Sequence, residues 1–96
     1  MRPSLALASH RDAVREMVLR FKTANPRVFG SVVRGDDSDE SDLDRLVDPL
    51  PGTTLFDLGG LLVALEELLG VRVDLLTPGD LPVKFRARVL AEAMPV

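Results

Sequence analysis

The fold is decided by the segment Gly30–Asp48, which reads GSVVRGDDSDESDLDRLVD. Its last part mixes acidic and aliphatic residues before a proline turn signal, a pattern that predicts a strand over residues 42–48. Side chains two positions apart on a strand share a face, so Asp42 and Asp44 are expected to point the same way. Neighbouring carboxylates raise one another's pKa, and a divalent cation removes that cost. The oxygen-only ligand set indicates Mg²⁺ or Mn²⁺ rather than zinc.

The glycine–serine step at the start of this segment predicts a phosphate site. Gly30 can adopt backbone conformations closed to other residues and lets a ligand approach closely. Ser31 is expected to cap a short helical turn over residues 31–34, whose free N–H groups would face an anion. Together with the two carboxylates, this step suits a complex of a divalent metal with a triphosphate.

The spacing of these motifs resembles that of a known superfamily. Gly-Ser, ten residues and then Asp-x-Asp is similar to the signature of the polymerase-β-type nucleotidyltransferases. The fuller string Gly-Ser-x-x-Arg-Gly…Ser-Asp-Leu-Asp-x-Leu-Val resembles the smallest branch, the MNT (minimal nucleotidyltransferase) domains. The resemblance covers essentially the whole chain and implies a single minimal nucleotidyltransferase domain over residues 1–96.

Hydrophobic periodicity and turn signals place the other elements. We expect helices over residues 9–24, 54–70 and 81–93, and strands over residues 27–30, 42–48 and 71–76. A strand–helix–strand unit of this length implies a right-handed crossover with the second and third strands parallel. The predicted fold is α/β (α+β), a three-stranded mixed sheet with helices mainly on one face. The resemblance identifies it as a polymerase-β-like nucleotidyltransferase palm.

Particular residues set the expected helix boundaries. Ser9 is expected to begin the first helix, with Asn25-Pro26 ending it. Thr53 or Thr54 is expected to cap the second helix, and Asp80 the third. His10 has no nucleophile motif near it and is expected to be inert.

Asp74 is the candidate for a third carboxylate of the site. In a parallel register it would lie beside Asp42 and Asp44. Aspartate is depleted in strand interiors, which favours a functional role over that of an ordinary edge-strand residue. The resemblance assigns Asp74 to the family's third catalytic carboxylate.

The resemblance also implies a mechanism, the transfer of a nucleoside monophosphate from an NTP to an acceptor hydroxyl. Asp42 and Asp44 would bind two Mg²⁺ ions. Asp74 would share the acceptor-side metal and help to deprotonate the hydroxyl.

The phosphate-binding roles follow from the same resemblance. Gly30 and Ser31 would hold the β- and γ-phosphates through backbone N–H groups and the hydroxyl. Two roles stay open for Arg34, contact with phosphate or pairing with a loop carboxylate. Ser41 is expected to orient the loop before the first aspartate.

Other charged residues are expected to lie mainly on solvated surfaces of the protein. Asp36, Asp37, Asp39 and Glu40 are expected to form a solvated acidic loop. Lys84, Arg86 and Arg88 are expected to form a solvated face of the last helix, with contact to phosphate or a partner as the alternative.

Arg45 departs from the family pattern, which usually has an apolar residue after the second aspartate. Strand alternation points its side chain away from the carboxylates and toward the face on which the helices pack. Burial there would need a partner or a route to solvent.

Composition excludes several classes of protein. The chain has 96 residues and no cysteine, which leaves neither a disulfide framework nor a thiolate metal site. Its apolar segments are too short to cross a membrane, and we expect a cytoplasmic protein. A net charge of −3 and only four aromatic residues, all phenylalanine, argue against strong nucleic-acid binding.

The resemblance also implies a partner. MNT domains typically pair with a HEPN-type ribonuclease toxin and act as its antitoxin, by transferring AMP from ATP onto a tyrosine of the toxin. This chain contains no tyrosine, so a tyrosine acceptor must be supplied in trans. Three alternatives remain: a non-catalytic nucleotide-binding antitoxin that occludes its partner, a nucleotidyltransferase of an RNA or a small molecule, and a simple metal-binding or structural domain. A homo-oligomer also stays open.

Overall fold

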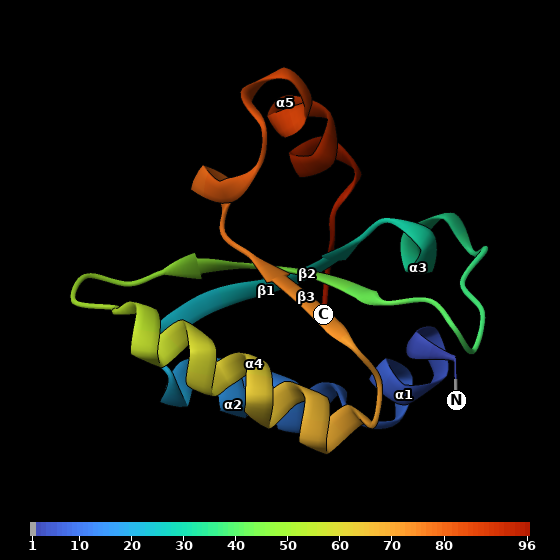
Figure 1. Cartoon of the computed structure of the whole chain (residues 1–96), viewed down its shortest axis with the longest axis horizontal. Helices are drawn as coiled ribbons and strands as arrows, with labels where there is room; N and C mark the ends of the chain where they lie inside the picture. The colour runs from blue at the N-terminus through green and yellow to red at the C-terminus, as the bar shows by residue number, and fades with distance from the viewer. Residues whose placement is uncertain (1) are drawn as a thin grey trace.

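A computed structural model describes residues 2–96 of the chain. Its elements are α1 (Pro3–Ser9), α2 (Arg11–Arg20), β1 (Thr23–Phe29), α3 (Ser31–Arg34), β2 (Leu43–Pro49), α4 (Leu55–Leu69), β3 (Val73–Leu76), the 3₁₀ helix η1 (Pro78–Asp80), α5 (Val83–Glu92) and β4 (Met94–Pro95). Helices α1, α2 and α4 cover one face of the sheet, and α5 stands over the other (Figure 1). The predicted α/β architecture is confirmed, with helices mainly on one face.

Over residues 2–96 the sheet has four strands in the order β3-β2-β1-β4, rather than the three predicted. β1 runs antiparallel to β2 and to β4, whereas β2 and β3 are parallel, as the crossover through α4 predicts. The sequence gives little sign of β4 because this strand has two residues, one of them a proline. It pairs Met94 with Val28 and Pro95 with Arg27 at the edge of β1.

The helix predicted over residues 9–24 is present as the shorter α2, and the prediction misses the helix α1 that precedes it in residues 2–96. Ser9 ends α1 instead of beginning a helix, and its hydroxyl donates to the Leu5 carbonyl at 3.0 Å. The chain then breaks at His10, whose Nδ1 lies 2.9 Å from the Ala6 carbonyl oxygen. This hydrogen bond gives His10 a structural contact at the junction of the two helices.

β1 begins earlier than predicted and includes Asn25-Pro26. The backbone turns with positive φ at Lys22 and again at Asn25, so α2 ends sooner than the apolar periodicity suggests. The register of β1 on β2 shifts between Ala24 and Arg27, and this irregularity accommodates the proline.

The hydrophobic core lies between the sheet and the helices α1, α2 and α4. Leu43 and Val47 of β2 point into it, as strand alternation predicts. Thr54 caps α4 in a capping box with Asp57, which confirms one of the two expected caps. The buried members of the core are Ala6, Leu7, Val14, Val18, Val28, Leu43, Val47, Leu61, Leu65, Leu69, Val73 and Val96.

The last helix begins differently from the prediction. Asp80 does not cap α5, because its carboxylate instead forms a capping box with Thr77 in η1. Pro82 is the N-cap residue of α5, and no residue of that helix is buried. Within residues 2–96, no helix is both long and apolar enough to cross a membrane.

Candidate active site

The parallel pairing of β2 with β3 brings the three predicted carboxylates together. Asp44 and Asp74 are direct partners in the register, and Asp42 lies immediately before β2. Burial raises the pKa of Asp44, and the charges of Asp74 and then Asp42 raise it further, whereas Arg34 lowers it. The side chain at the centre of the group is therefore surrounded by surplus negative charge.

This donor set fits a divalent cation that arrives with phosphate. In the described part of the chain, no cluster of three or more acidic, histidine or cysteine side chains is arranged to hold a metal ion by itself. Mg²⁺ is commonly held by one or two carboxylates together with the phosphate oxygens of its substrate. Asp42 and Asp44 offer such oxygens, and the raised pKa of Asp44 indicates a site that a cation would stabilise.

Gly30 fits against the Asp44 carboxylate so closely that no other residue is compatible with this geometry. A Cβ at position 30 would collide with Oδ2 of Asp44 and would lie 3.1 Å from its Cγ. The Gly30 backbone also has φ 74° and ψ −143°, which other residues rarely adopt. The glycine of the Gly-Ser motif is thus required by the second aspartate of the Asp-x-Asp motif.

The short helix predicted after this glycine is confirmed as α3, but its cap is different. Gly30 is the N-cap residue, and Ser31 is the first residue of the helix. No side-chain capping bond is made, so the hydroxyl of Ser31 is not used as a cap. Ser31 thus stands beside Gly30 at the edge of the site, with its hydroxyl uncommitted to capping.

The acidic loop is only partly solvated, contrary to the prediction. Asp37 is 5% exposed, and its carboxylate accepts hydrogen bonds from the Ser4 amide at 2.9 Å and from Nη2 of Arg2 at 3.3 Å. The Ser4 amide is the main cause that lowers the pKa of Asp37. Asp37 therefore ties the start of α1 to the loop that leads into Asp42. The burial of Asp37 depends on a segment distant in the sequence, so no local sequence pattern predicts it.

Ser41 and Arg34 take positions that agree with their expected roles. The Ser41 hydroxyl accepts a hydrogen bond from the Ser38 amide at 2.8 Å and fixes the turn before Asp42. Nε of Arg34 lies 3.5 Å from Oδ2 of Asp36, so the pairing with a loop carboxylate is present. Arg34 also lines a cavity together with Asp44, which keeps phosphate contact within its reach.

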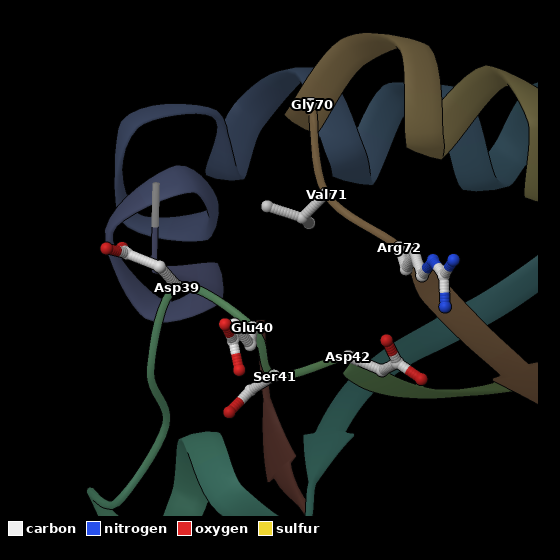
Figure 2. A pocket seen from close by; sticks show the side chains of 7 residues that line it. All are labelled: Asp39, Glu40, Ser41, Asp42, Gly70, Val71 and Arg72. Atoms are coloured by element: carbon white, nitrogen blue, oxygen red, sulfur yellow. The ribbon is translucent and has the colours of Figure 1, made fainter.

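Two cavities adjoin the aspartates. The first, which we call the Asp42 cavity, has a volume of about 420 Å³ and is lined by Asp39, Glu40, Ser41, Asp42, Gly70, Val71 and Arg72. Figure 2 shows the Asp42 and Arg72 side chains projecting to the same side from the starts of β2 and β3. The second, the Asp44 cavity, measures about 320 Å³ and is lined by Phe29, Gly30, Arg34, Asp44, Phe85, Arg88, Val89 and Glu92. The two aspartates of the motif therefore open onto different spaces.

Half of the lining of the Asp44 cavity comes from α5. The sequence indicates contact with phosphate only as the alternative role of Arg88, and it does not place the other lining residues of this helix at the site. Phe85, Arg88, Val89 and Glu92 are spaced at i, i+3, i+4 and i+7, the spacing of one helical face. That spacing is visible in the sequence. The sequence does not indicate on which side of the sheet α5 lies.

Arg45 points away from the site, as strand alternation predicts. It is fully buried on the helix-packed face, and within the described part of the chain none of its three guanidinium nitrogens has a hydrogen-bond partner. Burial, with a smaller effect from Arg11, lowers its pKa to about 10. The expected partner for this buried cation is therefore not among the described residues.

Comparisons with known proteins agree with this geometry. Residues 7–96 match the model of the nucleotidyltransferase domain family. The chain is 39% identical over 88 residues to the protein adenylyltransferase MntA of Thermococcus cleftensis, covering 92% of this chain and 86% of that protein. It is 36% identical over 80 residues to MJ0435 of Methanocaldococcus jannaschii, named as a candidate protein adenylyltransferase, covering 83% of this chain and 86% of the relative.

Solved structures share the fold and extend the comparison. The structure of a candidate minimal nucleotidyltransferase superposes with a TM-score of 0.87 at 44% identity, covering 97% of this chain and 95% of that one. A crystal structure of a toxin–antitoxin with AMP-PNP shares the fold with a TM-score of 0.66 at 18% identity, over 84% of this chain and 70% of that one. The chain belongs to the nucleotidyltransferase domain family and is a nucleotidyltransferase enzyme.

Proposed function

We propose that this protein transfers AMP from Mg-ATP to a hydroxyl group of a partner protein. The observation that carries the proposal is the pairing of Asp44 with Asp74 in register, with Asp42 beside them and the Gly30 backbone against Asp44. The relatives named protein adenylyltransferases support AMP as the transferred group and a protein as the acceptor. We take the whole chain, residues 1–96, to be one catalytic domain.

The catalytic residues in this proposal are the three aspartates. Asp42 and Asp44 would hold two Mg²⁺ ions, with Asp74 sharing the one on the acceptor side. Bound Mg²⁺ would neutralise charge on the triphosphate and on the oxygens that attack and leave. Asp74 is exposed beside Asp44, and in this proposal it would accept the proton of the acceptor hydroxyl.

The reaction is a balanced displacement at phosphorus. The acceptor oxygen forms a bond to the α-phosphorus of ATP, the bond from that phosphorus to the bridging oxygen breaks, and pyrophosphate leaves. Gly30 and Ser31 bind the β- and γ-phosphates, and Arg34 exchanges its exposed pairing with Asp36 for a phosphate oxygen. These groups hold the leaving pyrophosphate in place while the hydroxyl attacks.

We propose a tyrosine of a HEPN-type ribonuclease toxin as the acceptor, which makes this protein the antitoxin of the pair. The chain itself has no tyrosine, so a tyrosine acceptor must come from another molecule. The fold is shared with a toxin–antitoxin structure that holds AMP-PNP. Asp74 is exposed on β3, one of the two edge strands of the sheet, where a second protein can reach it.

The test is adenylyl transfer to a HEPN-type toxin encoded beside this protein's gene. The protein is incubated with Mg²⁺, ATP and the toxin, and intact-mass and peptide spectra of the toxin are recorded. We expect the mass of AMP to be added at a tyrosine by the wild type and by Asp12→Asn, an exposed control on α2. Asp44→Asn should abolish the addition.

One outcome would replace the enzymatic proposal. If the toxin forms a stable complex with this protein and loses its ribonuclease activity without any gain in mass, then occlusion explains the neutralisation. An unmodified toxin that neither binds nor is inhibited would reject the HEPN-type partner.

A further inference from the structure

We propose that one face of α5 is the second wall of the nucleotide site, with Arg88 binding the phosphates and Phe85 packing against the base. The inference rests on the proposed function for the identity of the ligand as a nucleotide. Its starting point is the Asp44 cavity, whose lining divides between α5 and the segment that carries Gly30 and Asp44.

The fold holds α5 over this cavity by its ends. Before the helix, Leu81 is 4% exposed, and its carbonyl accepts a hydrogen bond from Nη2 of Arg86 at 3.0 Å. After the helix, β4 joins the edge of β1. Between these anchors no residue of α5 is buried, and Figure 1 shows the helix on the side of the sheet opposite α2 and α4. The face of α5 that lines the Asp44 cavity, which we call its inner face (Phe85, Arg88, Val89 and Glu92), is therefore free to contact a ligand.

The apolar part of the cavity suits a nucleobase. Phe29 and Phe85 are two of the four phenylalanines of the chain, and they line the cavity from β1 and α5 respectively, with Val89 one turn beyond Phe85. Phe29 is the register partner of Asp44, so its side chain shares the face of the sheet on which the site lies. Phe85 remains 48% exposed, and a flat ring placed against it would bury apolar surface.

The charged part of the cavity suits a triphosphate. Arg34 of α3 and Arg88 of α5 line it together with Asp44. A guanidinium group can bind phosphate oxygens through two parallel hydrogen bonds. The two arginines would offset the negative charge of the phosphates, which the carboxylates alone would repel.

Within residues 2–96, the side-chain ion pairs of both arginines are with exposed carboxylates. Nε of Arg88 lies 3.3 Å from Oε1 of Glu92, and Arg34 makes the similar pair with Asp36 at 3.5 Å. Exposed ion pairs of this kind contribute little and are screened by salt. A triphosphate that enters the cavity can therefore replace Glu92 as the ion-pair partner of Arg88 with little loss of free energy, because it carries more negative charge than a single carboxylate.

The experiment measures binding, without turnover, of two probes that share phosphates and differ in the base. Titration calorimetry with Mg-ATP and with Mg-tripolyphosphate is carried out on the wild-type protein, Arg88→Gln and Phe85→Ala. Arg20→Gln and Phe56→Ala are the matched controls, since Arg20 is exposed on α2 and Phe56 is 92% exposed on α4. Thermal melts are used to check that all variants are folded. We expect them to be folded because neither Arg88 nor Phe85 is buried.

We expect two distinct patterns of loss. Arg88→Gln should weaken both probes by about tenfold, as expected for a lost charge-assisted hydrogen bond. Phe85→Ala should weaken Mg-ATP by about fivefold or more and leave Mg-tripolyphosphate unchanged, because only ATP has a base to stack. Wild-type affinity for Mg-ATP in either variant overturns the role assigned to that residue.

The outcome also separates this inference from the proposed function. If the expected losses are found while no AMP reaches the toxin, the second wall stands and the transfer reaction is rejected. If AMP transfer occurs and both variants bind Mg-ATP like the wild type, the transfer reaction stands and the α5 wall is rejected. A wild-type protein that binds neither probe rejects both.

Discussion

Asp44 and Asp74 sit directly opposite one another in the parallel pairing of β2 with β3, so two carboxylates occupy adjacent positions on one face of the sheet. Burial of Asp44 and this neighbour both raise the pKa of Asp44 above its ordinary value of 3.8. The arrangement is costly for the folded chain alone and becomes favourable when a cation is bound. The site therefore carries a measurable stability cost.

The first prediction concerns the pH dependence of stability. Because the folded protein binds the Asp44 proton more tightly than the unfolded chain does, the free energy of unfolding should fall as the pH rises from below 3.8 through the raised pKa. Above that pKa the loss is complete and constant. Asp44→Asn should lack this loss and be more stable than the wild type at neutral pH, as measured by urea denaturation between pH 3 and pH 8.

The control for this experiment is Asp12→Asn, whose side chain is 94% exposed on α2. It should follow the wild-type pH profile. An Asp44→Asn profile parallel to that of the wild type would show that Asp44 titrates normally in the folded protein.

The second prediction separates a steric requirement for glycine from a conformational one. Gly30 and Gly35 both have positive φ, but a Cβ meets the Asp44 carboxylate only at Gly30, whereas the space around Gly35 is open. Gly35→Ala should lose about 1 kcal/mol of stability and retain Mg-ATP binding. Gly30→Ala should lose about 2–5 kcal/mol, since overlap adds to backbone strain, and should no longer bind Mg-ATP.

Urea denaturation and calorimetry test both variants. Equal stability losses in the two would mean that the Asp44 side chain moves aside freely. In that case the close fit between positions 30 and 44 would not be the reason for glycine.

The third prediction concerns the buried cation Arg45. Its three guanidinium nitrogens are without hydrogen-bond partners in the described residues, so replacing it by an apolar side chain of similar length removes a desolvation cost. Arg45→Met should raise the free energy of unfolding by about 1–4 kcal/mol. Mg-ATP binding should not change, because Arg45 lies on the face of the sheet opposite the aspartates.

A paired arginine provides the comparison. Arg27 forms an ion pair with Asp48, so Arg27→Met should lower stability by about 1 kcal/mol. If Arg45→Met were instead strongly destabilising, buried water or an anion would have to satisfy the guanidinium in solution.

The fourth prediction uses two adjacent glycines within α4. A Cβ at Gly60 would lie 2.7 Å from Cε1 of Phe21, whereas the space around Gly59 is open. Gly59→Ala should stabilise the protein by about 0.5–1 kcal/mol through helix propensity. Gly60→Ala should destabilise it by about 1–3 kcal/mol, because the Phe21 ring must move. Thermal melts compare the two, and a gain of stability in both would show that the ring adapts without cost.

The sequence predicts the part of the site that is encoded locally. Gly30, Asp42 and Asp44 lie within one segment, so the sequence alone brings them near one another. Asp42 precedes β2 and lines a different cavity from Asp44, so strand alternation does not by itself give the direction of both aspartates. Asp74 could be added because the length of the crossover fixes a parallel pairing. The direction of Arg45 follows from the same alternation.

The features that sequence analysis misses depend on contacts between distant segments. Asp37 is buried because Arg2 and Ser4 fold back onto it, and nothing in the acidic loop itself indicates this. β4 exists only because the edge of β1 is available to it. The inner face of α5 has a readable helical spacing, but its proximity to Asp44 is a property of the assembled fold.

The order of the strands also bears on how a bound nucleotide would act on the folding reaction. β1 and β2 are consecutive strands and pair with each other, whereas α4 separates Asp44 from Asp74 in the sequence, and α5 is more distant still from Asp44. Non-local contacts of this kind tend to form late. Interactions absent from the transition state change the rate of unfolding rather than that of folding. A bound nucleotide is therefore expected to lengthen the lifetime of the folded state and leave the speed of folding almost unchanged.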